Sequence, residues 1–101
     1  MTMMTFKTDE PKNCGIIKIS KNGVVKKIFE KKRKVYGNIA NGAIYILSKK
    51  FLKLIKNKNY RDFSTEVLPK FVGRIFTCQT TQPLIDIGTK KNYKLAKKIK
   101  V

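Results

Sequence analysis

Short runs of apolar residues alternate with polar positions along the first third of the chain, a pattern that is typical of β-strands. It predicts strands over residues 2–8, 16–19 and 24–29. Asn22-Gly23 separates the second run from the third and favours a two-residue type I′ turn, in which both central residues take positive φ. We therefore expect an antiparallel β-hairpin in this part of the chain.

The middle of the chain predicts one strand and two helices. Residues 43–47 form a continuous apolar run, which suits a strand buried on both faces. Ser48 is a favourable N-cap for a helix over residues 49–56. Asp62 offers a capping side chain for a short helix that continues to Leu68.

The last third predicts two further strands and a final helix. Residues 75–78 and 84–87 are rich in β-forming residues, and the second run places Asp86 at the carboxyl end of its strand. Thr89 can cap the C-terminal helix. The whole pattern indicates one mixed α/β domain with a β-hairpin and flanking helices.

Composition agrees with a single folded domain. The chain has 101 residues, of which 42% are hydrophobic, and this is enough for a modest core in spite of the charge. No apolar run approaches the roughly 20 residues of a membrane helix. The first residues lack the basic-then-apolar order of a secretory signal. We expect a soluble, cytoplasmic protein that does not act at a membrane.

The net charge of +18 raises the alternative of a small basic nucleic-acid-binding protein. Among the 24 basic residues, however, the arginines are only Arg33, Arg61 and Arg74. Arg is the preferred residue for bidentate phosphate and base contacts, whereas Lys is a hydrated point charge that commonly covers surfaces. Charge alone supports this alternative, so nucleic acid is not the expected partner.

The side chains available for chemistry are limited. The chain has no His, and its two cysteines, Cys14 and Cys78, are far apart in sequence. This excludes a Cys/His zinc site and His-dependent nucleophilic catalysis. Any reaction must therefore use carboxylates, lysines, backbone amides or a metal ion.

Two carboxylates stand out as candidate functional groups. Asp86 lies between apolar residues and Gly88, where it could hold a hard cation such as Mg²⁺ or simply cap a turn. Glu30 ends a predicted strand and is followed by Lys31. A Glu that accepts from sugar hydroxyls beside a Lys that meets phosphate would recognise a sugar phosphate, although the pair could also be only the polar exit of a strand.

Two glycine-containing motifs could approach a ligand closely. Gly15 follows Cys14, and Asn41-Gly42 precedes the apolar run at 43–47. A glycine allows close backbone approach and an Asn side chain offers both a donor and an acceptor. Both motifs are also common in turns.

In their order along the chain, these motifs resemble the C-terminal half of the sugar-1-phosphate nucleotidylyltransferases, of the mannose-1-phosphate guanylyltransferase and glucose-1-phosphate thymidylyltransferase type. The resemblance covers residues 3 to about 96. The matching strings are MMTFKT (3–8), CGI (14–16), VKKIFEK (25–31), NIANGAIYIL (38–47), DFSTEVLP (62–69) and DIGT (86–89).

The resemblance implies a Rossmann-like α/β fold with a mixed sheet. It also implies a reaction in which an oxygen of a sugar-1-phosphate attacks the α-phosphorus of a nucleoside triphosphate and releases pyrophosphate. Mg²⁺ is the implied cofactor. The implied catalytic residues are Asp86, as a metal ligand, and Lys31. Such a reaction needs positioning and charge neutralisation, so the absence of His is no objection.

The resemblance further implies a set of residues that bind the sugar phosphate. Glu30 would hold sugar hydroxyls, and Lys31 would lie near the sugar phosphate. Gly15 and Asn41-Gly42 would belong to loops that close around the sugar.

The chain departs from the family pattern in three respects. Lys32 stands where Pro usually follows the Glu-Lys pair, and Lys90-Lys91 occupy the first turn of the last helix, where they oppose its dipole. Nothing matches the Gly-rich nucleotide loop or the first metal aspartate of the N-terminal half. We therefore expect a fragment, in which Met1 is an internal methionine.

A fragment of this kind should need the N-terminal half of the domain or self-associate. The run at 43–47 would then expose an apolar face and an unpaired edge. The remaining alternative is an inactive assembly or binding subunit of the same fold.

Overall fold

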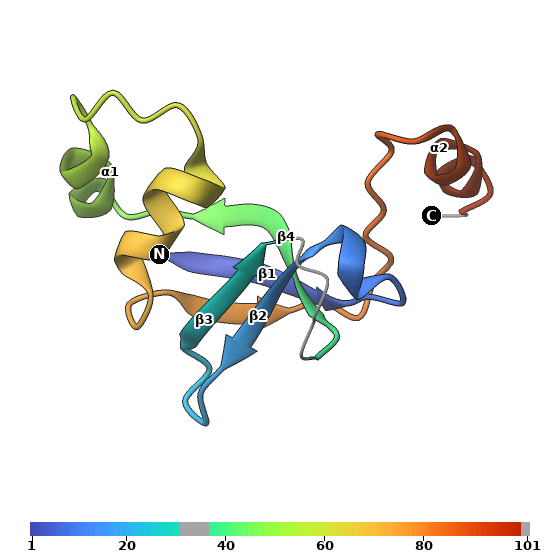
Figure 1. The fold of residues 1–101 in the computed structure, drawn as a ribbon, viewed down its shortest axis with the longest axis horizontal. Coiled ribbons are helices and arrows are strands. Elements are labelled where there is room, and N and C mark those ends of the chain that lie inside the picture. Colours follow the sequence, from blue (N-terminus) through green and yellow to red (C-terminus); the bar gives the residue numbers. More distant parts are fainter. Residues whose placement is uncertain (31–36, 100–101) are drawn as a thin grey trace.

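A mixed five-stranded sheet forms the centre of the computed structural model, which describes residues 1–30 and 37–99 (Figure 1). In the described residues the strands are ordered β3-β2-β4-β1-β5. β1 runs antiparallel to β4 and parallel to β5. The bounds are β1 Thr2–Lys7, β2 Gly15–Ile19, β3 Val25–Glu30, β4 Ile39–Ile46 and β5 Phe76–Gln79. The predicted α/β fold with a mixed sheet is confirmed.

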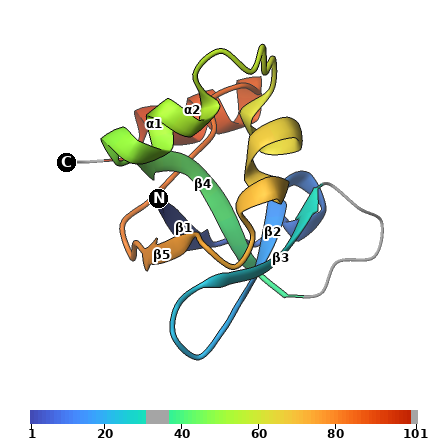
Figure 2. The same cartoon turned by 90° about the vertical axis from the view of Figure 1, so that its left-hand side faces the viewer.

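Helices flank this sheet. Two short helices, η2 and η3, follow one another and pack on one face, and Figure 2 shows them on the same side of the sheet as α1. The last helix, α2, stands apart from α1, η2 and η3 in Figure 1. Their bounds are η1 Pro11–Asn13, α1 Lys49–Ile55, η2 Phe63–Val67, η3 Leu68–Phe71 and α2 Lys90–Lys97. None of the helices in the described residues is long and apolar enough to cross a bilayer.

The core lies between the sheet and the helix η3. Met3 of β1 and Ile17 of β2 pack with Leu68 of η3, and Val25 and Ile75 complete the buried cluster. Met3, Leu68, Val25 and Ile75 are fully inaccessible to solvent. Since a strand alternates its side chains, the neighbours of Met3 along β1 face the other side of the sheet.

The predicted N-caps of all three helices are confirmed. In each case a side-chain oxygen accepts a hydrogen bond, 3.1 Å long, from the backbone N–H three residues later. The caps are Ser48 for α1, Asp62 for η2 and Thr89 for α2. These contacts satisfy donors that the first turn of a helix would otherwise leave unpaired.

The predicted type I′ turn of the hairpin is wrong. Among the residues of this turn only Gly23 takes a positive φ, +77°, and its N–H donates to the carbonyl of Ser20. The carbonyl of Gly23 accepts from both the backbone N–H and the hydroxyl of Thr77 in β5. This contact with a distant strand favours a longer turn, with Gly23 in the left-handed region that glycine adopts without strain.

Two further strand predictions need correction. β4 begins earlier than expected, so that Asn41-Gly42 lie inside it, and it is not buried on both faces because Ile46 is 75% exposed. Residues 84–87 are not a strand, and they pair with none of the described strands. Asp86 therefore lies in the connection to α2 rather than at the carboxyl end of a strand.

The face of the sheet opposite η3 exposes apolar side chains. Thr2 pairs in register with Ile46 on one side and with Phe76 on the other, so these three side chains share that face. Ile46 and Phe76 are 75% and 56% exposed. The expected exposed apolar face of β4 is thus present, but β4 is an inner strand and the edges of the sheet are β3 and β5.

Candidate functional site

Gly15 and Glu30 are brought together by the hairpin. They are direct partners in the antiparallel β2–β3 ladder, so their side-chain positions lie on the same face. A Cβ atom added at Gly15 would lie 2.8 Å from Oε1 of Glu30. A residue larger than glycine would therefore displace the Glu30 carboxylate from its place in the structure.

The carboxamide of Asn41 is held at both ends. Its Oδ1 accepts from the backbone N–H of Ala43 at 2.8 Å, and its Nδ2 donates to the hydroxyl of Tyr45, also at 2.8 Å. Ala43 takes a positive φ of +57°, at an irregularity where β4 bulges against β1. Because a backbone N–H can only donate, the contact with Ala43 fixes which end of the amide is oxygen.

Tyr45 connects this strand with the helix η2. Its ring centroid lies 4.7 Å from that of Phe63, and its hydroxyl forms hydrogen bonds with Asn41 and lies near the side chain of Ser64. Burial raises the pKa of Tyr45 above its ordinary value of 10.0, the interactions with Asn41 and Ser64 lower it, and the nearby charge of Glu30 raises it. With the net shift upward, the hydroxyl stays protonated at neutral pH and can donate.

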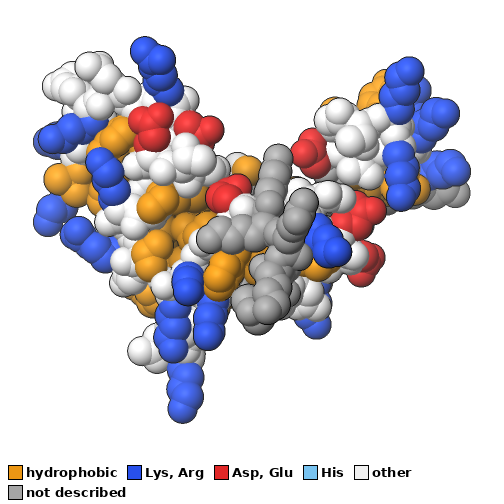
Figure 3. Space-filling view, in the orientation of Figure 1, with side chains coloured by type: hydrophobic (Ala, Val, Ile, Leu, Met, Phe, Trp, Pro, Cys, Tyr) orange, Lys and Arg blue, Asp and Glu red, His pale blue; other side chains and the backbone are white. Residues whose placement is uncertain are grey.

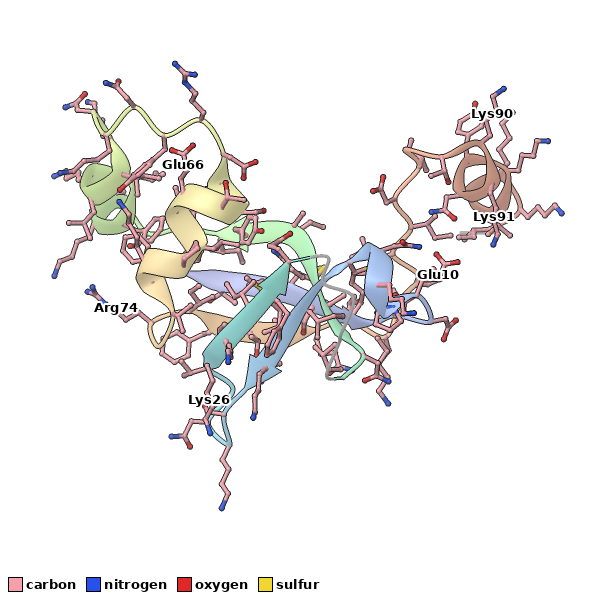
Figure 4. All side chains as sticks on the ribbon, in the orientation of Figure 1. Glu10, Lys26, Glu66, Arg74, Lys90 and Lys91 are labelled. Carbon is pink, nitrogen blue, oxygen red and sulfur yellow. The ribbon has the colours of Figure 1, made fainter. Side chains whose placement is uncertain are left out.

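A cavity of about 470 Å³ adjoins these groups. Glu30 and Lys26 of β3 line one side, and Ser64 and Thr65 of η2 line the other. Figure 4 labels Lys26 on β3 and, well separated from it in this view, Glu66, which follows Thr65 on η2. The rest of the wall is mostly apolar and includes Ile28, Pro69 and Val72. A largely apolar cavity of this size with a few charged and hydroxyl groups is typical of a site for a small ligand.

Gly42 has a packing role. A Cβ atom added there would lie 2.9 Å from Cδ2 of Leu84 and 2.9 Å from the carbonyl oxygen of Met4. The absence of a side chain thus lets the segment that leads to Asp86 lie directly against β4. A sugar-binding role for Gly42 stays a prediction.

Asp86 itself is exposed and forms a turn. Its Oδ1 accepts from the backbone N–H of Gly88 at 2.9 Å, which is the turn contact that the sequence offered as an alternative to metal binding. The described residues contain no group of three or more His, Cys, Asp or Glu that could hold a metal. Any Mg²⁺ bound through Asp86 would therefore need further ligands, such as substrate phosphates.

The structure thus brings Gly15, Glu30 and Asn41 to one face of the sheet, whereas Asp86 lies in a separate connection. Lys31 lies outside the described residues. Sequence reasoning missed Tyr45 and Ser64, because the tyrosine stands in an apolar run and the serine in a capping string. The signal that could have indicated Tyr45 was its even spacing from Asn41, since alternate residues of a strand share a face.

On the face shown in Figure 3, the basic side chains of the described residues are spread over several elements. In the view of Figure 3 they lie over the hairpin tip, α1 and α2, rather than along a continuous stripe. The described residues contain a single ion pair, Lys91 with Glu10 at 3.7 Å, so few of the described basic side chains are neutralised by a carboxylate. Charge of this kind attracts polyanions through counterion release without reading their sequence.

We therefore expect only weak, sequence-independent binding to duplex DNA. Affinity measured at about 50 and 200 mM salt should fall steeply, by orders of magnitude, between the two conditions. Comparing two unrelated duplexes of equal length controls for sequence. Submicromolar binding at the higher salt with a preference for one duplex would instead support the nucleic-acid alternative.

Comparison with known proteins shows the family to which the chain is related. The family model described as Nucleotidyl transferase matches residues 1–99. A mannose-1-phosphate guanyltransferase 2 from Candida glabrata is 28% identical over 96 residues, which cover 91% of this chain and 26% of the relative. The mannose-1-phosphate guanylyltransferase catalytic subunit beta of Drosophila melanogaster is 28% identical over 94 residues, covering 91% of the chain and 25% of the relative.

The chain therefore spans about a quarter of the length of the curated relatives that it matches. The family model, by contrast, matches nearly the whole chain, and the mixed α/β sheet agrees with it. The resemblance to the sugar-1-phosphate nucleotidylyltransferases is confirmed. The chain belongs to the nucleotidyl transferase family.

Proposed function

We propose that this chain is the sugar-phosphate-binding portion of a nucleotidyltransferase, which makes a nucleoside-diphosphate sugar from a nucleoside triphosphate and a sugar-1-phosphate. The observation that carries the proposal is the cavity lined by Glu30 and Ser64, with the hydrogen-bonded pair Asn41 and Tyr45 next to Ser64. The names of the relatives, which act on mannose-1-phosphate, support the choice of substrate class.

The chemistry of these four residues complements a sugar. The carboxylate of Glu30 can only accept hydrogen bonds, and sugar hydroxyls donate them. The Nδ2 of Asn41 carries two protons, of which the contact with Tyr45 uses one. Lys26 lines the same cavity and can contribute positive charge for a phosphate, beside the predicted contribution of Lys31.

In this proposal the nucleotide binds to a portion of the enzyme that corresponds to the part of the relatives that this chain does not match. Asp86 would hold Mg²⁺ together with ligands from the substrates and from that part, and the ion would neutralise phosphate charge. The proposed chain thus needs a nucleotide-binding portion for turnover. A cytoplasmic location is a prediction that accompanies this reaction.

Glu30→Gln should weaken binding of mannose-1-phosphate, because an amide replaces one accepting oxygen by a donor and removes the charge. We expect an affinity loss of about tenfold, as for a hydrogen bond to a charged group. Titration of the 101-residue chain, followed by amide chemical shifts in NMR spectra, measures this even when affinity is weak.

Glu10→Gln is the matched control. It makes the same chemical change at an exposed carboxylate whose partner is Lys91 of α2, outside the cavity wall. It should leave binding unchanged, and inorganic phosphate should bind the chain and both variants alike. Equal affinity of the Glu30 and Glu10 variants for mannose-1-phosphate would contradict the proposed site.

A further inference from the structure

We infer that Tyr45 is a positioning residue, whose hydroxyl orients the Asn41 carboxamide to donate a hydrogen bond to the sugar. This inference rests on the proposed function, and it assigns a role to a residue that the sequence analysis did not select as a site residue. It follows from the hydrogen bonds of Asn41 and from the contacts that hold Tyr45 in turn.

The hydrogen bonds of Asn41 determine which group remains for a ligand. Oδ1 accepts from the N–H of Ala43 at 2.8 Å and lies 3.1 Å from the hydroxyl of Tyr45. Nδ2 lies 2.8 Å from the same hydroxyl oxygen and directs one proton to it. The second Nδ2 proton lies in the amide plane and points away from the Tyr45 hydroxyl. The contacts with Ala43 and Tyr45 therefore leave Asn41 with one donor that has a fixed direction.

Tyr45 can hold this amide because it is itself held by η2. Its ring packs against Phe63 with centroids 4.7 Å apart, and the side chain of Ser64 lies near its hydroxyl. Ser64 lines the cavity together with Glu30. One phenol therefore links a residue of the cavity wall on η2 to the amide on β4.

The geometry of η2 agrees with this role. Residues 63–67 form a single π-helical turn, a rare arrangement that is frequent at functional sites. The turn places Phe63 and Ser64 next to each other on Tyr45. Glu30 is close enough to Tyr45 for its charge to act on the hydroxyl. A donor held by Tyr45 and the accepting carboxylate of Glu30 would together offer a sugar one donor and one acceptor, at a low entropic cost of ordering.

Tyr45→Phe tests the inference, because it removes the hydroxyl and keeps the ring that packs on Phe63. In the ligand-free 101-residue chain, ¹⁵N relaxation should show increased motion of the Asn41 side-chain amide. Affinity for mannose-1-phosphate should fall about three- to tenfold, the effect of one neutral hydrogen bond. Tyr60→Phe is the control, since it removes an exposed hydroxyl whose partner is Lys70.

A double-mutant cycle then separates positioning from direct contact. In an Asn41→Ala background, Tyr45→Phe should have no further effect on affinity, because the amide that it orients is gone. An equal loss in both backgrounds would mean that Tyr45 acts without Asn41, and would overturn the inference. If the Asn41 variant does not fold, the relaxation measurement on the Tyr45 variant decides, and an unchanged amide signal overturns the inference.

The outcomes also separate this inference from the proposed function. No binding of mannose-1-phosphate, glucose-1-phosphate or inorganic phosphate by the unaltered chain would contradict the proposed function itself, and this inference with it. Binding by the unaltered chain with the same affinity in Tyr45→Phe would contradict the inference alone.

Discussion

The 101-residue chain by itself is expected to release no pyrophosphate from any combination of nucleoside triphosphate and sugar-1-phosphate, and to self-associate. Turnover should be absent because the resemblance leads us to expect that the Gly-rich nucleotide loop belongs to a part of the relatives that this chain does not match. Self-association should follow from the exposed face formed by Ile46 and Phe76, since exposed apolar patches commonly mark interfaces.

Polar substitutions on this face test self-association separately from turnover. Ile46→Thr combined with Phe76→Thr keeps β-forming side chains and should shift the chain toward monomer in analytical ultracentrifugation, without creating turnover. Leu54→Gln is the control, because it removes an exposed apolar side chain from α1 instead. A stable monomer with metal-dependent pyrophosphate release from the unaltered chain would contradict both parts of this prediction.

The second large effect is expected at Asp86, in a protein that joins this chain to a nucleotide-binding portion. Asp86→Asn should lower Mg²⁺-dependent turnover by about a hundredfold or more, because an amide lacks the charge of a metal ligand. Asn can accept the same hydrogen bond from Gly88, so the turn should be kept and the change confined to charge.

Pyrophosphate release measured over a range of Mg²⁺ concentrations tests the role of Asp86. Asp9→Asn is a suitable control, because it removes one exposed carboxylate from a loop near the end of β1. Unchanged turnover of the Asp86 variant at low Mg²⁺ would show that this aspartate only forms the turn. An inactive joined protein that still binds sugar phosphate would favour the alternative of a binding or assembly subunit.

Features that depend on neighbouring residues could be predicted from the sequence alone. The caps Ser48, Asp62 and Thr89 each bond to a backbone N–H only three residues away, so local chemistry was enough to find them. The strands of the hairpin were found for the same reason, because their alternation and a short glycine-containing turn lie close together. The order of short motifs was also sufficient to indicate the family.

Features that depend on distant segments were decided by the tertiary structure. The Gly23 turn differs from the prediction because Thr77 of β5 binds its carbonyl. Residues 84–87 have the composition of a strand, but they pair with no described strand, and composition cannot supply a partner.

In the candidate site, too, some residues could be identified from the sequence and others only from the tertiary structure. Glu30 and Asn41 could be selected from the sequence, because their chemistry is visible in their side chains. Tyr45 could not, since its importance arises from the amide of Asn41 on one side and from Phe63 and Ser64 on the other. The sequence by itself determined the local elements and the kind of chemistry available, whereas only long-range pairing and packing decided which side chains meet, because such contacts join residues that no local pattern relates.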